Sequence, residues 1–161
     1  MWAATQNHLG QALRDRVFGD PAANIAAAFA CFDRALAVRT RTAVPLNWAT
    51  TQHNMGAAYH ICHGKNNAGA AGVDEAVACY HRALEVRTPE TSPQEWALTT
   101  FSLLLALVDG ERWSEAMECG RTLERFGSRW ATWLTHQAAV ARALVQTERA
   151  LAQSGSEGSG G

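Results

Sequence analysis

The segment AVACYHRALEVRT, residues 76–88, repeats the segment AFACFDRALAVRT, residues 28–40, with nine of its thirteen positions identical. The offset is 48 residues throughout. A weaker third copy begins at Ala116 and again places a cysteine, Cys119, three residues after its first alanine. Identity of this extent indicates an internal repeat, and the repeat determines which architecture to expect.

A second type of segment precedes each copy and opens with the dipeptide Trp-Ala. It begins at Trp2, Trp48 and Trp96, at offsets of 46 and 48 residues. In the middle copy Trp48, Thr51 and Met55 recur at the spacing of one helical face. Both types of segment therefore predict helices, and the repeating unit is a helix A, a loop, a helix B and a second loop.

Proline and capping residues predict where these helices begin. Residues 92–95, Ser-Pro-Gln-Glu, have the pattern of a capping box with proline at the first helical position. Residues 20–21, Asp-Pro, predict the start of the first helix B, and Pro45 predicts the start of the second helix A. The glycine-rich residues 64–72 predict a long loop inside the second repeat.

The repeats resemble the tetratricopeptide repeat (TPR) family, in the extended-repeat form found in large bacterial multi-repeat proteins. The Leu-Gly-x-x-Tyr element of that family has its counterpart in residues 55–59, Met-Gly-Ala-Ala-Tyr, and the alanine-aromatic-alanine element in Ala76, Tyr80 and Ala83. The resemblance implies an all-α fold, a right-handed superhelix of three helical hairpins plus a C-terminal capping helix. Gly56 and Ala76 lie farther apart than the family pattern places them.

The resemblance also implies a domain organisation. We expect one repeat domain over residues 1–153 and a flexible Gly/Ser-rich tail over residues 154–161. Within the domain we expect three repeats and a capping helix, at about 2–40, 46–88, 94–127 and 129–152. The first repeat has no cap in this scheme, so we also expect self-association through the uncapped N-terminal repeat.

The repeat positions predict how the helices pack. Gly56 and the alanines of helix B let helices A and B approach closely, and the ring of Tyr80 fills the remaining space. The cysteines at the shared position, Cys31, Cys79 and Cys119, are expected to be small core residues rather than nucleophiles.

Charge and composition exclude several classes of function. The chain has 14 Lys and Arg against 15 Asp and Glu, so it lacks the basic surplus that binding to nucleic-acid phosphates requires. No uncharged apolar stretch is long enough for a membrane span, and residues 1–6 carry no secretory signal, which predicts a cytoplasmic protein with no membrane partner. Arg39 and Arg87 recur at the end of helix B and suit its negative pole, with phosphate binding as the weaker interpretation.

Metal-binding and catalytic patterns are sparse. His60, Cys62 and His63 form the one local cluster of metal-capable side chains, but soft metals need three or four converging ligands and no second paired motif is present. The common phosphate-binding, hydrolase and zincin motifs do not occur. We therefore expect no catalytic residue, cofactor or metal, and keep a metal- or redox-responsive protein using this cluster as a rival hypothesis.

In the TPR family, helix A lines a concave groove, and its groove positions can be carried over through Gly10, Gly56 and Leu104. The resemblance thus implies a non-catalytic scaffold that binds a peptide or protein segment on the concave helix A surface, or else a structural fragment of a longer array. Leu98 and Leu105 belong either to this groove or beneath the capping helix. The Lys/Asn pattern that binds chaperone tails is absent. The expected ligand contacts are Asn7, Gln11, Arg14, Thr50, His53, His60 and Phe101.

Overall fold

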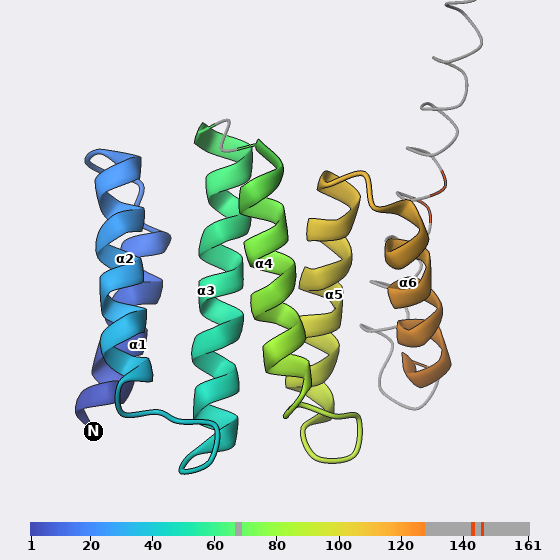
Figure 1. Ribbon diagram of the computed structural model, residues 1–161, viewed down its shortest axis with the longest axis horizontal. Coiled ribbons are helices and arrows are strands. Elements are labelled where there is room, and N and C mark those ends of the chain that lie inside the picture. The colour runs from blue at the N-terminus through green and yellow to red at the C-terminus, as the bar shows by residue number, and fades with distance from the viewer. Residues whose placement is uncertain (67–68, 128–142, 144–145, 147–161) are drawn as a thin grey trace, which may run out of the picture. The chain divides into compact units, whose positions relative to one another are not determined.

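The computed structural model describes residues 1–66 and 69–127, together with 143 and 146. These residues form six α-helices and no strand (Figure 1), so the all-α prediction is confirmed for them. None of the described helices is long and apolar enough to cross a membrane. The predicted capping helix at 129–152 and the tail at 154–161 lie outside the described residues, apart from 143 and 146. The helices are α1 (Trp2–Arg14), α2 (Pro21–Leu36), α3 (Pro45–Asn66), α4 (Gly69–Leu84), α5 (Pro93–Asp109) and α6 (Trp113–Gly127).

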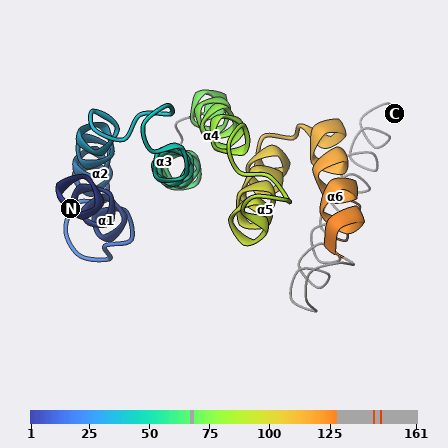
Figure 2. The same ribbon diagram turned by 90° about the horizontal axis from the view of Figure 1, so that it is seen from below.

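The chain divides into two compact units, Met1–Thr99 and Thr100–Gly161. In the first unit α1 packs against α2 and α3 against α4, and the two hairpins contact each other through α2 and α3. Figure 2 shows these two pairs from below. The second unit begins inside α5 and contains α6.

The predicted helix starts at Pro21, Pro45 and Pro93 are confirmed. The carboxylate of Asp20 accepts hydrogen bonds from the backbone N–H groups of Ala22 and Ala23, as an N-cap should. The side-chain cap predicted at residues 92–95 is wrong, because Ser92 Oγ is buried with no hydrogen-bond partner in the described structure. The backbone N–H of Ser92 instead donates to the carbonyl of Thr88, so the preceding turn orders this helix start.

The long loop predicted at residues 64–72 is also wrong. Helix α3 continues to Asn66 and α4 begins at Gly69, so the additional residues lengthen two helices. Alanines among residues 68–76 supply strong helix propensity, which outweighs the isolated glycines.

Glycine–aromatic contacts bring the two helices of each hairpin in the first unit together. A Cβ atom added at Gly56 would lie 2.8 Å from Cε1 of Tyr80, and one added at Gly10 would lie 2.5 Å from Cε1 of Phe32. Only glycine permits these approaches. The packing predicted for Gly56 and Tyr80 is confirmed. The alanines that flank the rings are fully buried, namely Ala28, Ala35, Ala76 and Ala83.

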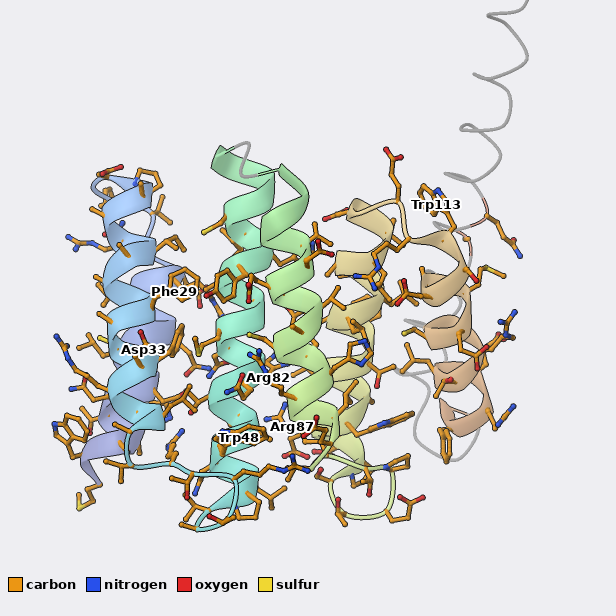
Figure 3. The ribbon with its side chains drawn as sticks, in the orientation of Figure 1. Phe29, Asp33, Trp48, Arg82, Arg87 and Trp113 are labelled. Carbon is orange, nitrogen blue, oxygen red and sulfur yellow. The ribbon has the colours of Figure 1, made fainter. Side chains whose placement is uncertain are left out.

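The contact between the two hairpins of the first unit is apolar at its centre. Ala28 and Phe32 of α2 form a buried cluster with Ala58 of α3. Phe29 reaches from α2 toward α3 (Figure 3), where its ring centroid lies 4.4 Å from that of Tyr59. Repetition of a hairpin thus buries a face that one hairpin alone would leave in water.

The turn between α5 and α6 closes helix α5. The N–H of Arg112 donates to the carbonyl of Leu107, and the N–H of Glu111 donates to that of Val108. Glu111 has a φ of 56°, so these bonds form a Schellman motif with glutamate at the left-handed position. Glycine is the residue usually found there.

Candidate interaction surface

A buried arginine follows each hairpin of the first unit and joins that hairpin to the next helix. Arg39, after α2, donates from Nη1 to Oγ1 of Thr51 on α3 at 3.0 Å. Arg87, after α4, donates from Nη1 to Oγ1 of Thr99 on α5 at 2.7 Å. Each threonine lies 12 residues after its arginine. The repeat therefore includes an Arg–Thr hydrogen bond that the sequence pattern did not identify.

Each of the two threonines also donates a hydrogen bond to a backbone carbonyl, which leaves its oxygen to accept from arginine. Thr51 Oγ1 donates to the carbonyl of Asn47 at 3.1 Å, and Thr99 Oγ1 donates to that of Glu95 at 2.6 Å. Because each hydroxyl proton is already used, the oxygen lone pairs remain for the guanidinium.

This arrangement corrects the interpretation of the two arginines as cations at the end of helix B. Arg39 is 7% exposed and Arg87 is 4% exposed, and both donate to the following helix. Burial lowers the pKa of both guanidinium groups. Figure 3 shows Arg87 at the end of α4. Their observed contacts are structural, because each guanidinium donates to a threonine of the following helix.

Asn7 and Gln11 of α1, both expected to contact a ligand, bind Asn54 of α3 instead. Asn54 Nδ2 donates to Asn7 Oδ1 at 3.0 Å, and Gln11 Nε2 donates to Asn54 Oδ1 at 3.1 Å. Asn7 is 1% exposed, so its side chain does not reach the surface. Gln11 is half-buried. The network fixes α1 against α3.

Arg14 and Thr50 are half-buried beside this network and also have partners in the protein. Arg14 forms a bidentate ion pair with Asp15, with nitrogen–oxygen distances of 2.8 and 3.0 Å. The hydrogen bonds from Arg14 lower the pKa of Asp15. Thr50 Oγ1 accepts from Nη2 of Arg87 at 2.9 Å and donates to the carbonyl of Leu46.

His53 is the most perturbed polar side chain of the predicted groove. Its ring centroid lies 5.5 Å from that of Tyr80, and its Nδ1 is buried without a hydrogen-bond partner in the described part of the chain. Burial, assisted by the charges of Arg87 and Arg14, lowers its pKa to about 4. The ring is therefore neutral near pH 7 and keeps an unused hydrogen-bonding atom.

The remaining predicted contacts are divided between the units. His60 is half-buried on α3. Phe101 is half-buried on α5 and belongs to the second unit, whereas the other six residues belong to the first. Leu98 is exposed and Leu105 is half-buried.

The cysteines and histidines give no described metal site. Among the described side chains no three His, Cys, Asp or Glu residues lie close enough to hold a metal ion, and the side chain of His63 is outside that set. Cys31 and Cys79 are buried, as expected for core residues, whereas Cys119 is half-buried. Burial raises the pKa of Cys79 and Cys119 to about 11, which disfavours the reactive thiolate.

Sequence reasoning missed Thr51, Asn54 and Thr99. The threonines could have been found from the constant spacing after Arg39 and Arg87, because both parts of the pair recur at the same offset. Asn54 had no such signal, since its partners occur in a helix of another repeat.

Comparison with known proteins does not add an identity to this surface. No protein-family model matches the chain, and neither a curated protein nor a solved structure matches it. The functional interpretation rests on the internal repeat and on the contacts described above.

Proposed function

We propose that the chain is a TPR-like scaffold that binds an extended segment of another protein beside the contact between α1 and α3. The observation that carries the proposal is a row of half-buried polar side chains on α1 and α3, namely Gln11, Thr50 and His53, which the neighbouring helices cover only in part. A TPR-like superhelix is the fold we infer for the whole array, supported by the glycine–aromatic packing and the repeated Arg–Thr bond.

Rigidity supports this function. Asn54 binds two residues of α1, and Arg87 binds Thr50 of α3 and Thr99 of α5. Polar groups held in this way are ordered before a ligand arrives, which reduces the conformational entropy lost on binding. The repeat thus offers fixed hydrogen-bonding groups to a peptide.

The local charges indicate a segment that binds through neutral hydrogen bonds. Arg14 is already neutralised by Asp15, and Arg87 is buried on two hydroxyls. His53 is uncharged near pH 7 because of its low pKa. We therefore expect backbone amides or amide side chains of the bound segment to contact the solvent-accessible parts of the half-buried His53 and Gln11 side chains.

Site-specific photo-cross-linking tests the location. A photoreactive residue replaces Ala57, which is half-buried on α3, and in a matched control it replaces Ala30, which is exposed on α2. We expect a discrete partner to cross-link from position 57 and not from position 30. Equal capture from both positions would contradict the proposal, as would capture from position 30 alone.

Affinity for the purified partner then tests the chemistry. His53→Ala should weaken binding about tenfold, which corresponds to about 1.4 kcal/mol. His8→Ala, at an exposed histidine of α1, is the matched control and should leave the affinity unchanged. Equal effects of the two substitutions would exclude a specific contact at His53.

A further inference from the structure

One face of α1 is exposed although its counterpart on α3 is covered. We call it the open face of α1 and define it by five exposed residues at helical spacing. Trp2 is 54% exposed and Leu9 is 45% exposed. The open face consists of Trp2, Thr5, His8, Leu9 and Ala12.

The repeat assigns a counterpart on α3 to every residue of the open face, at an offset of 46. Met55 and Ala58 pack on the buried cluster of α2. Thr51 and Asn54 are buried, and each is hydrogen-bonded to the first repeat: Thr51 accepts from Arg39, and Asn54 donates to Asn7. Trp48 is half-buried. The same set of side-chain positions is therefore an established interface between hairpins in α3, whereas in α1 no described part of the chain covers it.

Thr5 makes the same type of backbone hydrogen bond as the threonines that accept from Arg39 and Arg87. Its Oγ1 donates to the carbonyl four residues earlier, that of Met1, at 3.4 Å. Thr51 and Thr99 make the same bond and then accept from a buried arginine. Thr5 is exposed, so its lone pairs are accessible to an incoming donor.

We propose that the open face of α1 docks a helical hairpin of the same repeat type, carried by a partner, whose second helix is followed by Val-Arg-Thr. The arginine of that hairpin donates to Thr5, and small and aromatic side chains of its second helix cover Leu9 and Ala12. This surface is separate from the one proposed above for peptide binding.

A second copy of this chain is the poorer occupant. Val-Arg-Thr occurs twice in the sequence, at residues 38–40 and 86–88. Both arginines are already buried on their own threonines, Thr51 and Thr99. A second copy could therefore reach Thr5 only by giving up one of these bonds.

A fusion tests the proposal on the full chain. Residues 45–95 are duplicated directly before Trp2, which places the added Arg87 twelve positions before Thr5, as in the two observed pairs. We expect amide hydrogen exchange across residues 5–12 to slow at least tenfold relative to the original chain. Circular dichroism should show that the added segment is helical.

Two matched fusions identify the contact. Arg87→Met in the added copy should remove most of the slowing, and His81→Ala in the added copy, at an exposed position of the α4 sequence, should keep it. Unchanged exchange in residues 5–12, an added copy that stays unfolded, or equal slowing with and without the added arginine would overturn the proposal.

Sedimentation of the original chain tests whether a second copy occupies the open face of α1. We expect a monomer, in which Trp2 stays accessible to a fluorescence quencher. A dimer that shields Trp2 would assign the open face to a second copy and overturn the choice of occupant.

Discussion

In the hairpins of the first unit the large side chain of the repeat pair is on the second helix, whereas in the α5–α6 pair it is on the first. In the first unit a glycine of the first helix faces an aromatic ring of the second, as Gly56 faces Tyr80. At the corresponding repeat positions α5 has Leu104 and α6 has Gly120, and both are buried. This exchange predicts that the repeat preserves the volume between paired helices rather than the identity of either residue.

Helix length differs in the same comparison. Helices α3 and α4 have 22 and 16 residues, whereas α5 and α6 have 17 and 15. The spacing of the glycine and its large counterpart follows this difference, being 24 residues from Gly56 to Tyr80 and 16 from Leu104 to Gly120. Similar side-chain patterns therefore occur on helices of unequal length.

The largest effect is expected when Gly56 is replaced by leucine, the residue at the corresponding position of the second unit. Gly56→Leu should lower the free energy of unfolding by about 3 kcal/mol, because its Cβ alone would lie 2.8 Å from Tyr80 Cε1 and 3.2 Å from the carbonyl oxygen of Ala76. Urea denaturation followed by circular dichroism measures the change. Ala26→Leu, at an exposed position of α2, is the control.

The double variant Gly56→Leu/Tyr80→Ala reproduces the volume exchange seen at Leu104 and Gly120. It should recover at least half of the stability lost in Gly56→Leu, since the leucine then occupies space that the ring has left. Additive losses from the two substitutions would show that volume conservation does not explain the difference between the units.

Much of this comparison could be predicted from the repeat alone. The internal repeat predicted the helix order, the proline and capping residues predicted three helix starts, and the TPR-like pattern predicted the contact of Gly56 with Tyr80. The burial of Asn7 could not be predicted, because it depends on an amide from a helix of another repeat. A groove position carried over from a family indicates a helix face, but not how deeply the neighbouring helix covers it.

Acid should destabilise the first unit through His53. Burial and the charges of Arg87 and Arg14 lower the pKa of His53 from 6.5 to about 4. The unfolded chain therefore binds a proton that the folded chain excludes. The stabilisation is fully present above pH 6.5 and is lost as the pH falls toward 4, by between about 2 and 3 kcal/mol.

Urea titrations at pH 7 and pH 4.5 measure this loss, and His53→Gln should reduce the difference between them. His8→Gln is the control at an exposed histidine. The described residues of the second unit contain no histidine, so exchange in α6, corrected for intrinsic pH dependence, should respond less than exchange in α3. Equal pH dependence in the parent and in His53→Gln would contradict the role of this ring.

The two Arg–Thr pairs allow a smaller comparison within the first unit. Arg87 donates to two hydroxyls, those of Thr99 and Thr50, whereas Arg39 donates to one hydroxyl and one carbonyl. Arg87→Met should lower the free energy of unfolding by about 2 kcal/mol and Arg39→Met by about 1 kcal/mol. The loss is smaller at Arg39 because this arginine makes one short hydrogen bond to a hydroxyl, whereas Arg87 makes two. Thermal and urea unfolding should agree on this order, and the reverse order would show that desolvation of the guanidinium dominates over its hydrogen bonds.

The smallest expected effect is a gain at the turn between α5 and α6. Glu111 has a φ of 56°, where a Cβ atom is unfavourable, so Glu111→Gly should raise the free energy of unfolding by about 1 kcal/mol. Gly110→Ala is the matched comparison, because Gly110 is not among the residues with positive φ: there alanine should be favoured over glycine by about 0.4 to 1 kcal/mol, the opposite preference to that at position 111. A loss of stability in Glu111→Gly would mean that the glutamate side chain contributes more than its backbone strain costs. Among the described residues Glu111 is the non-glycine residue with a positive φ, so the gain should be confined to exchange in α5 and α6.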